Sequence, residues 1–220
     1  MGLAMLRPDL TTAQVSGGLE LAKRCALACA AVRPSDIDLA VRLLEGSPVK
    51  PAGVVGFPHG TQTTASKLHE ARDLLRRGAR ELNVVVAIPN LLSREFQYVE
   101  IELAQISDLC HKQGAALTAI LENAYLTDEL KIIACRAAEH AQVDFVSTST
   151  GFAPSGYTPA DVKLMRQWLP ESIGVEAAGG LRTLDQVLEA REAGCARVSS
   201  GNVGAILEEC RSRRQARKPA

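Results

Sequence analysis

The sequence has no excess of charge of either sign, because 25 Lys and Arg residues balance 25 Asp and Glu residues in a chain of 220. Contacts with nucleic acid or an anionic membrane need a surplus of Lys and Arg, so we expect neither partner. The chain also lacks an apolar run of the roughly 18 to 20 residues that cross a bilayer. Its start does not have the charged and apolar pattern of a secretory signal. We therefore predict a cytoplasmic protein.

The six cysteines form neither a CxxC pair nor a cluster with histidine. A disulfide framework or a zinc site would need such spacing, and we expect no metal and no cofactor. A GxGxxG motif after a predicted strand is also missing, which weakens the case for a dinucleotide-binding domain. The basic run at the end of the chain, over 214–220, is expected to be a disordered tail.

Short β-rich runs alternate with longer amphipathic runs along the whole chain. Several of the short runs are apolar on both faces, as buried parallel strands require. The expected strands are 26–32, 51–57, 81–87, 116–122, 143–149, 173–179 and 196–200. The expected helices are 11–23, 35–44, 64–77, 94–112, 128–141, 159–169, 184–193 and 203–213. Glycines at the predicted helix ends and Ser, Thr or Asn residues at the predicted starts support these ranges.

Seven strand–helix units and a leading helix fall one strand short of an eightfold barrel. The segment 2–6 could supply the missing strand, although it is short and contains Gly2. Uninterrupted alternation gives either a closed barrel or an open doubly wound sheet, and the strand count favours the barrel. We therefore predict an α/β protein with one domain over 1–213, an eightfold (β/α) TIM barrel with a leading N-terminal helix.

In such a barrel the active site lies at the carboxyl ends of the strands. Two loops at these ends combine glycines with the start of a helix, where backbone N–H groups can cradle a phosphate. The residues of these loops that we predict to bind phosphate are Gly179, Gly180, Arg182, Ser199, Gly201 and Asn202. In the alternative interpretation the glycines only turn the chain, and Arg182 pairs with a helix carboxylate.

Glu176 lies between Val175 and Ala177 in a predicted strand. A carboxylate there is costly unless it faces the barrel mouth or finds a partner. Two interpretations stay open, a general acid or base and a carboxylate paired with an arginine. The hydroxyl-rich run 147–150 is a weak signal by itself, because such residues are common in strands.

Five segments resemble the deoxyribose-phosphate aldolase family, in the order of the family and at similar spacing. They are 55–60 (VGFPHG), 78–83 (GARELN), 120–123 (ILEN), 144–152 (DFVSTSTGF) and 178–183 (AGGLRT). The resemblance implies an eightfold α/β barrel whose first strand is 2–6. It also implies a small phosphorylated sugar or aldehyde as the ligand, and carbon–carbon bond cleavage or formation through a Schiff base without a metal.

The chain departs from the family at three positions that the imine route uses. Ser147 stands in place of the imine-forming lysine, Glu176 in place of a second lysine, and Asn83 in place of an aspartate. A serine hydroxyl cannot form an imine with a carbonyl, and no other lysine ends a predicted strand. These departures from the family therefore imply that the Schiff-base mechanism is absent. We further expect Glu176 to lack the neighbouring ammonium group that the family has at this site.

The resemblance is retained at the phosphate end of the site, where it adds Gly151 to the predicted phosphate-binding residues. Two functions remain open. In the first, the protein is an acid–base lyase, an enzyme in which Glu176 moves a proton. The residues that would orient a carbonyl or hydroxyl are Asn83, Ser147 and Glu122. In the second, the protein is a noncatalytic relative that binds a phosphorylated metabolite or a protein partner. The short, nonpolar first strand also makes a homodimer contact plausible.

Overall fold

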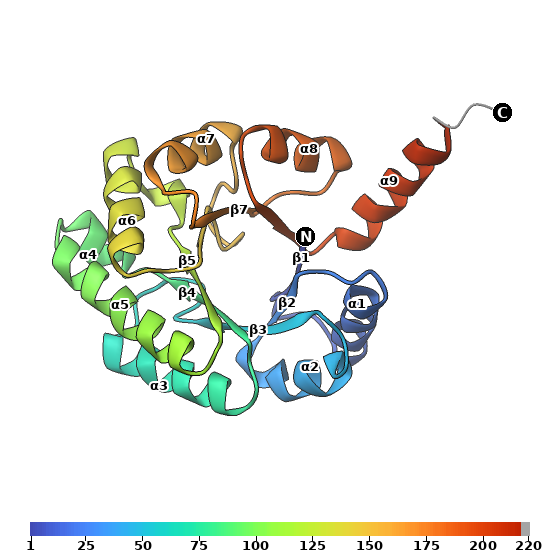
Figure 1. Ribbon diagram of the computed structural model, residues 1–220, viewed down its shortest axis with the longest axis horizontal. Helices are drawn as coiled ribbons and strands as arrows, with labels where there is room; N and C mark the ends of the chain where they lie inside the picture. Colours follow the sequence, from blue (N-terminus) through green and yellow to red (C-terminus); the bar gives the residue numbers. More distant parts are fainter. Residues whose placement is uncertain (217–220) are drawn as a thin grey trace.

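The computed structural model describes residues 1–216 and shows a closed barrel of eight parallel strands, paired in the order of the sequence (Figure 1). The strands are β1 (Gly2–Met5), β2 (Cys29–Val32), β3 (Lys50–Val55), β4 (Glu81–Val85), β5 (Ala116–Ile120), β6 (Phe145–Ser147), β7 (Gly174–Ala178) and β8 (Arg197–Ser200). Gly2 pairs with Ser199 and Leu3 with Ser200, so β1 and β8 close the barrel. The predicted eightfold barrel and its first strand are confirmed.

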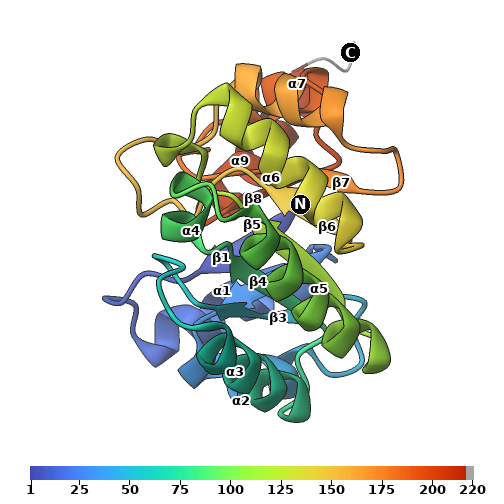
Figure 2. The same cartoon turned by 90° about the vertical axis from the view of Figure 1, so that its left-hand side faces the viewer.

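Helices surround the barrel on its outer side, as the two perpendicular views show (Figures 1 and 2). They are α1 (Thr12–Arg24), α2 (Ile37–Leu44), α3 (Thr64–Arg76), α4 (Ile88–Leu92), α5 (Phe96–Lys112), α6 (Asp128–His140), α7 (Pro159–Trp168), α8 (Leu184–Glu192) and α9 (Val203–Ala216). Single 3-10 turns occur at η1 (Pro34–Asp36) and η2 (Asn123–Tyr125). The helix expected to lead the barrel is α1. It follows β1 and completes the first strand–helix unit.

The connection after β4 differs from the prediction. The strand expected over 81–87 ends at Val85, and the short helix α4 begins at Ile88. Pro89 stands in the first turn of α4, where the missing N–H of proline is tolerated. The apolar residues after Val85 therefore continue into a helix, although their composition also fits a strand.

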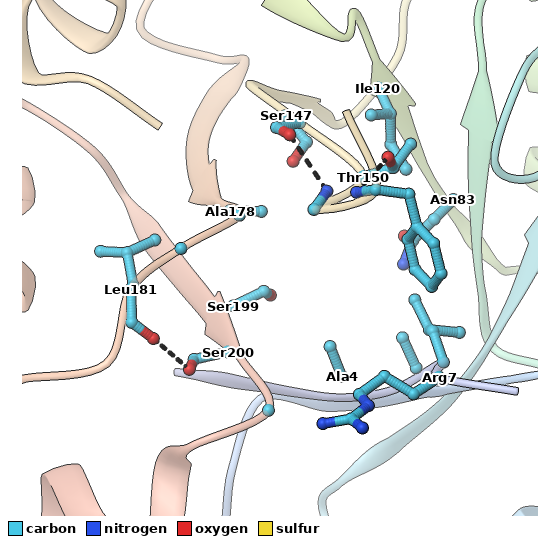
Figure 3. Close-up of a pocket in the computed structure, with 18 of the residues that line it drawn as sticks. Ala4, Arg7, Asn83, Ile120, Ser147, Thr150, Ala178, Leu181, Ser199 and Ser200 are labelled. Carbon is cyan, nitrogen blue, oxygen red and sulfur yellow. Dashed lines mark hydrogen bonds between the residues drawn. The ribbon is translucent and has the colours of Figure 1, made fainter. Parts of the chain in front are cut away.

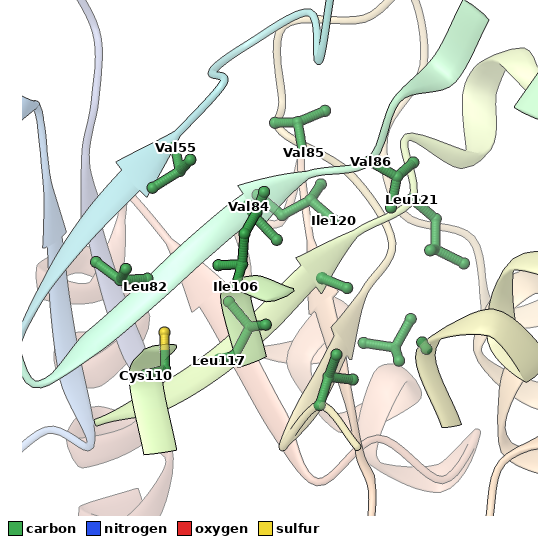
Figure 4. Packing of buried hydrophobic residues seen from close by; sticks show 14 of the residues in the cluster. Val55, Leu82, Val84, Val85, Val86, Ile106, Cys110, Leu117, Ile120 and Leu121 are labelled. Carbon is green, nitrogen blue, oxygen red and sulfur yellow. The ribbon is translucent and has the colours of Figure 1, made fainter. Parts of the chain in front are cut away.

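The outer faces of the strands pack against the helices and form the main apolar core (Figure 4). Leu82 and Val84 of β4 and Leu117 of β5 are fully buried, as are Ile106 and Cys110 of α5. Burying such side chains supplies the main driving force for folding. This packing fixes the strand ends that carry the site.

The inside of the barrel has an apolar and a polar part. Cys29, Ala31 and Ala52 form a small apolar cluster of their own on β2 and β3. On the opposite side, Arg197 of β8 reaches Glu81 of β4 with two hydrogen bonds of 2.9 and 2.6 Å. Charged and polar groups therefore fill the interior beside β4 to β8.

The last helix extends further than expected. α9 runs to Ala216, so it includes the first three residues of the tail that we expected to be disordered over 214–220. The rest of that tail, 217–220, lies outside the described residues. Within residues 1–216, no helix combines the length and the apolar character needed to span a membrane.

Candidate functional site at the carboxyl ends of the strands

A cavity of about 350 Å³ opens at the carboxyl ends of the strands (Figure 3). Ten of the eleven predicted site residues line it. They are Asn83, Ser147, Gly151, Glu176, Gly179, Gly180, Arg182, Ser199, Gly201 and Asn202. Residues far apart in the sequence thus meet in one pocket, because parallel strands bring their carboxyl ends to the same side of the barrel.

Glu122 is the one predicted site residue that does not line this pocket. Its side chain is buried and accepts hydrogen bonds from Ser149 Oγ (2.7 Å), from the Thr150 backbone N–H (3.3 Å) and from the Thr150 hydroxyl. Ser149 and Thr150 belong to the pocket wall. The structure therefore places Glu122 behind the loop that follows β6, where it holds that loop in position.

Two consecutive glycines shape the loop after β7. Gly179 and Gly180 have φ angles of +86° and +82°, in the left-handed region that glycine adopts without steric cost. A Cβ atom on Gly179 would lie 2.8 Å from Ser149 Oγ, whereas a Cβ on Gly180 would meet open space. Glycine is therefore needed at 179 for space and at 180 for its φ angle. Backbone N–H groups in such a turn can form a concavity for an anion.

Helix α8 starts directly after this loop and fixes its end. Thr183 caps the helix, since its side chain accepts from the Gln186 backbone N–H. Gln186 Oε1 accepts from the backbone N–H of Arg182 at 2.8 Å. The Arg182 side chain is exposed and forms no ion pair with any residue of the described range. The alternative that Arg182 pairs with a helix carboxylate is therefore not what the structure shows.

Ser200 connects the loops after β7 and β8. Its hydroxyl donates to the Leu181 carbonyl at 2.6 Å (Figure 3). It also accepts from the Asn202 backbone N–H at 2.9 Å. One buried side chain thus sets the spacing between the two predicted phosphate loops.

Arg7 is a pocket residue that the sequence analysis missed. It follows β1, and its side chain lines the pocket while it forms an exposed ion pair with Asp9 (Figure 3). Its position directly after a strand end was the signal that could have identified it. The rim of the pocket thus carries two guanidinium groups, those of Arg7 and Arg182.

Glu176 has a cationic partner, as one of the two interpretations of the sequence allowed. Arg197, its register neighbour on β8, donates from Nε to the Glu176 carboxylate, and both side chains are buried. The interpretation of Glu176 as a carboxylate paired with an arginine is therefore the one observed. Burial alone would lower the pKa of Arg197, but the carboxylates of Glu176 and Glu81 raise it, so the guanidinium stays charged. Arg197 stands at the start of β8, so a search limited to the carboxyl ends of the strands did not identify it.

Two polar atoms in the pocket have no partner. Ser147 Oγ and Asn83 Oδ1 are buried and form no hydrogen bond with any described residue. Their side chains are 1% and 8% exposed and line the cavity from β6 and β4 (Figure 3). An unsatisfied buried polar atom costs about 1 to 3 kcal/mol, which a bound ligand with matching groups would recover.

No lysine lines the pocket in the part of the chain that the structure describes. The most deeply buried lysine, Lys67, lies on α3 outside the barrel wall. Its Nζ donates to the Val85 carbonyl at 2.8 Å and to Glu102 at 2.6 Å. Burial lowers the pKa of Lys67, but the amine is engaged away from the cavity.

Comparison with known proteins places the chain among aldolases. Residues 9–206 match the family described as "DeoC/LacD family aldolase". The deoxyribose-phosphate aldolase of Rhodopirellula baltica is 38% identical over 208 residues, which are 94% of this chain and 86% of the relative. The enzyme of the same name from Thermococcus kodakarensis is 41% identical over 179 residues, 80% of each chain.

Solved structures with a similar fold also include aldolases. An aldolase named QR15 superposes with a TM-score of 0.92 at 30% identity, covering 99% of this chain and 97% of the other. A deoxyribose phosphate aldolase from Aeropyrum pernix, described as a unique tetramer, gives 0.89 at 30% identity, covering 96% and 89%. The match of fold, pocket position and sequence over nearly the whole length leads to one conclusion: this chain belongs to the DeoC/LacD family of aldolases.

Proposed function

We propose that this protein binds a small phosphorylated sugar or aldehyde in the pocket at the barrel mouth and that it does not form a lysine imine with it. One observation carries the proposal. Arg182 stands without an ion-pair partner beside the left-handed turn of Gly179 and Gly180, while no described lysine reaches the same cavity.

The rim supplies what a phosphate group needs. Backbone N–H groups of a glycine turn can donate to phosphate oxygens, and a guanidinium adds charge and paired donors. The loops after β7 and β8 bring Gly180, Arg182 and Gly201 to one side of the pocket. Relatives named deoxyribose-phosphate aldolase support a phosphorylated sugar as the ligand class.

The inner end of the pocket, its floor, is lined by Glu176, Ser147 and Asn83. It lacks the amine that imine chemistry requires. A Schiff base forms from a neutral primary amine, and the hydroxyl of Ser147 cannot replace it. Lys67 is bonded to Glu102 on the outer side of the barrel wall, so it offers no substitute. We therefore propose binding without covalent attachment of the ligand.

Lyase chemistry by proton transfer is a second candidate, and the position of Glu176 in the pocket lining favours it. The ion pair with Arg197 holds the Glu176 carboxylate in place, and in this candidate Glu176 would take the role of the general base. Ser147 and Asn83 would orient a hydroxyl or carbonyl of the ligand. Glu122 would act through the loop that it holds. This candidate needs neither a metal nor a cofactor.

Calorimetric titration with 2-deoxyribose 5-phosphate tests the proposed binding. We expect saturable binding that Arg182→Gln weakens by about tenfold or more, because a charge-assisted contact to phosphate is lost. Arg191→Gln changes an exposed arginine on α8, the helix that follows the loop of Arg182; it is the matched control and should leave the affinity unchanged. Absence of binding by the wild-type protein, or equal binding by Arg182→Gln, would contradict the proposal.

An aldehyde-release assay on the same sample separates the two candidates. Release that Glu176→Gln abolishes would establish proton-transfer lyase chemistry. Binding without release would leave the protein as a noncatalytic member of the family.

A further inference from the structure

The interior of the barrel beneath the pocket holds more negative than positive charge. Glu81 and Glu176 share the single guanidinium of Arg197. Glu122, beside the pocket wall, accepts hydrogen bonds from hydroxyl and backbone groups but from no cation in the described range. Two buried carboxylates in the barrel interior and a third behind the pocket wall thus stand against one buried cation.

The imbalance is local, because the other buried charges are paired. Lys67 binds Glu102 at 2.6 Å, and Asp161 binds Lys131 at 2.7 Å. An unpaired charge in a low-dielectric interior is costly, and a nearby opposite charge offsets that cost. The barrel interior is therefore a place where a ligand of positive charge would be stabilised.

The other residues of the pocket show where a positively charged group of a ligand would bind. The rim carries two exposed guanidinium groups, that of Arg182 and that of Arg7, which is paired with Asp9. The floor offers Glu176 together with Ser147 Oγ and Asn83 Oδ1, two buried atoms that lack partners. The pocket therefore has a positive rim and an acceptor-rich, negative floor.

We propose that the ligand supplies the missing cation, as a phosphorylated compound with a protonated primary amine at the end opposite its phosphate. This inference rests on the proposed function and names its substrate class, which comprises aminoalkyl phosphates and amino sugar phosphates. An ammonium group carries three donors. These match the Glu176 carboxylate, the Ser147 hydroxyl oxygen and the Asn83 amide oxygen. A terminal hydroxyl would offer one donor and no charge.

A metal ion fits this floor less well than an ammonium group. Within residues 1–216, no group of three or more His, Cys, Asp or Glu side chains is placed to hold one. Glu176 is the only carboxylate among the described residues that line the cavity, whereas divalent cations usually bind several oxygen ligands from the protein. The neutral oxygens of Ser147 and Asn83 are suitable acceptors for N–H donors.

Two matched probes test the inference, 5-aminopentyl phosphate and 5-hydroxypentyl phosphate, which differ only at the group opposite the phosphate. In calorimetric titrations at pH 7 we expect the amine to bind about tenfold more tightly, since its contacts are charge-assisted. Glu176→Gln should reduce this preference to about twofold or less. Glu171→Gln, an exposed glutamate just before β7, is the control and should keep the preference.

A second variant keeps the test decisive if Glu176→Gln fails to fold. Ser147→Lys would place an ammonium group of the protein itself on the floor, and it should abolish the preference for the amine probe. Equal binding of the two probes by the wild-type protein would overturn the inference while leaving the proposed phosphate binding intact. If neither probe nor 2-deoxyribose 5-phosphate binds, the proposed function fails and the inference fails with it.

Discussion

The guanidinium of Arg197 on β8 reaches across the barrel to the carboxylate of Glu81 on β4, with hydrogen bonds of 2.9 and 2.6 Å. The same guanidinium binds Glu176 and donates to Thr118 Oγ1 at 3.0 Å. One side chain therefore links four strands beneath the pocket. The floor of the site is built on this network.

Removing the guanidinium should destabilise the protein strongly. We expect Arg197→Leu to lower the free energy of unfolding by about 3 to 5 kcal/mol, because Glu81 and Glu176 would be left buried without a cation. Urea denaturation measures the change. Arg191→Leu on the exposed face of α8 should alter stability by only about 0.5 kcal/mol. A loss below about 1 kcal/mol for Arg197→Leu would show that the network contributes little.

Glu122 should affect ligand binding through the loop after β6. In Glu122→Gln the amide can no longer accept with both oxygens from Ser149 and Thr150, so the pocket wall loosens. We expect the affinity for 2-deoxyribose 5-phosphate to fall about fivefold, with a smaller effect from the exposed control Glu129→Gln. Unchanged affinity in a folded Glu122→Gln variant would mean that this wall does not contribute to binding.

The cysteines should differ in reactivity according to burial. Burial raises the pKa of Cys110 and of Cys135 to about 12, so at pH 8 both remain thiols rather than reactive thiolates. Cys210 is exposed on α9. Mass spectrometry after iodoacetamide treatment should show Cys210 modified in the native protein, with Cys110 and Cys135 modified only after unfolding. Rapid labelling of Cys110 at pH 8 without unfolding would contradict the packing of α5.

Two glycine substitutions should change stability in opposite directions. Gly17 lies within α1, and a Cβ there meets no atom within 4 Å, so Gly17→Ala should stabilise the protein by about 0.5 to 1 kcal/mol. Gly180 also has open space, but its φ of +82° strains any other residue, and Gly180→Ala should cost about 1 to 2 kcal/mol. Urea denaturation of both variants measures the difference. Equal changes in stability for the two variants would indicate that the loop after β7 accommodates alanine without backbone strain.

The sequence predicted the barrel because local patterns determine it. Strand and helix periods, helix caps and terminal glycines are short-range signals, and even the weak segment 2–6 forms β1 as expected. The boundary after β4 was wrong because an apolar run such as 86–92 fits a strand or a helix until its packing is known.

The site residues at the carboxyl ends of the strands could be predicted, because the fold determines their position. Strand-end reasoning and the family resemblance together found ten pocket residues. The partner of Glu176 could not be found that way, since Arg197 begins its strand and binds Glu81, 116 positions away in the chain. Contacts across a barrel depend on register and side-chain direction, which sequence spacing alone does not fix. The expected homodimer and cytoplasmic location stay predictions.

Borohydride trapping tests the central claim most directly. The purified protein is mixed with 2-deoxyribose 5-phosphate and sodium borohydride, and its intact mass is measured beside a sample without the sugar. We predict identical masses, because the pocket presents the hydroxyl of Ser147 and no lysine of the described chain. A mass increase that maps to a single lysine and disappears when that lysine is replaced would contradict the account.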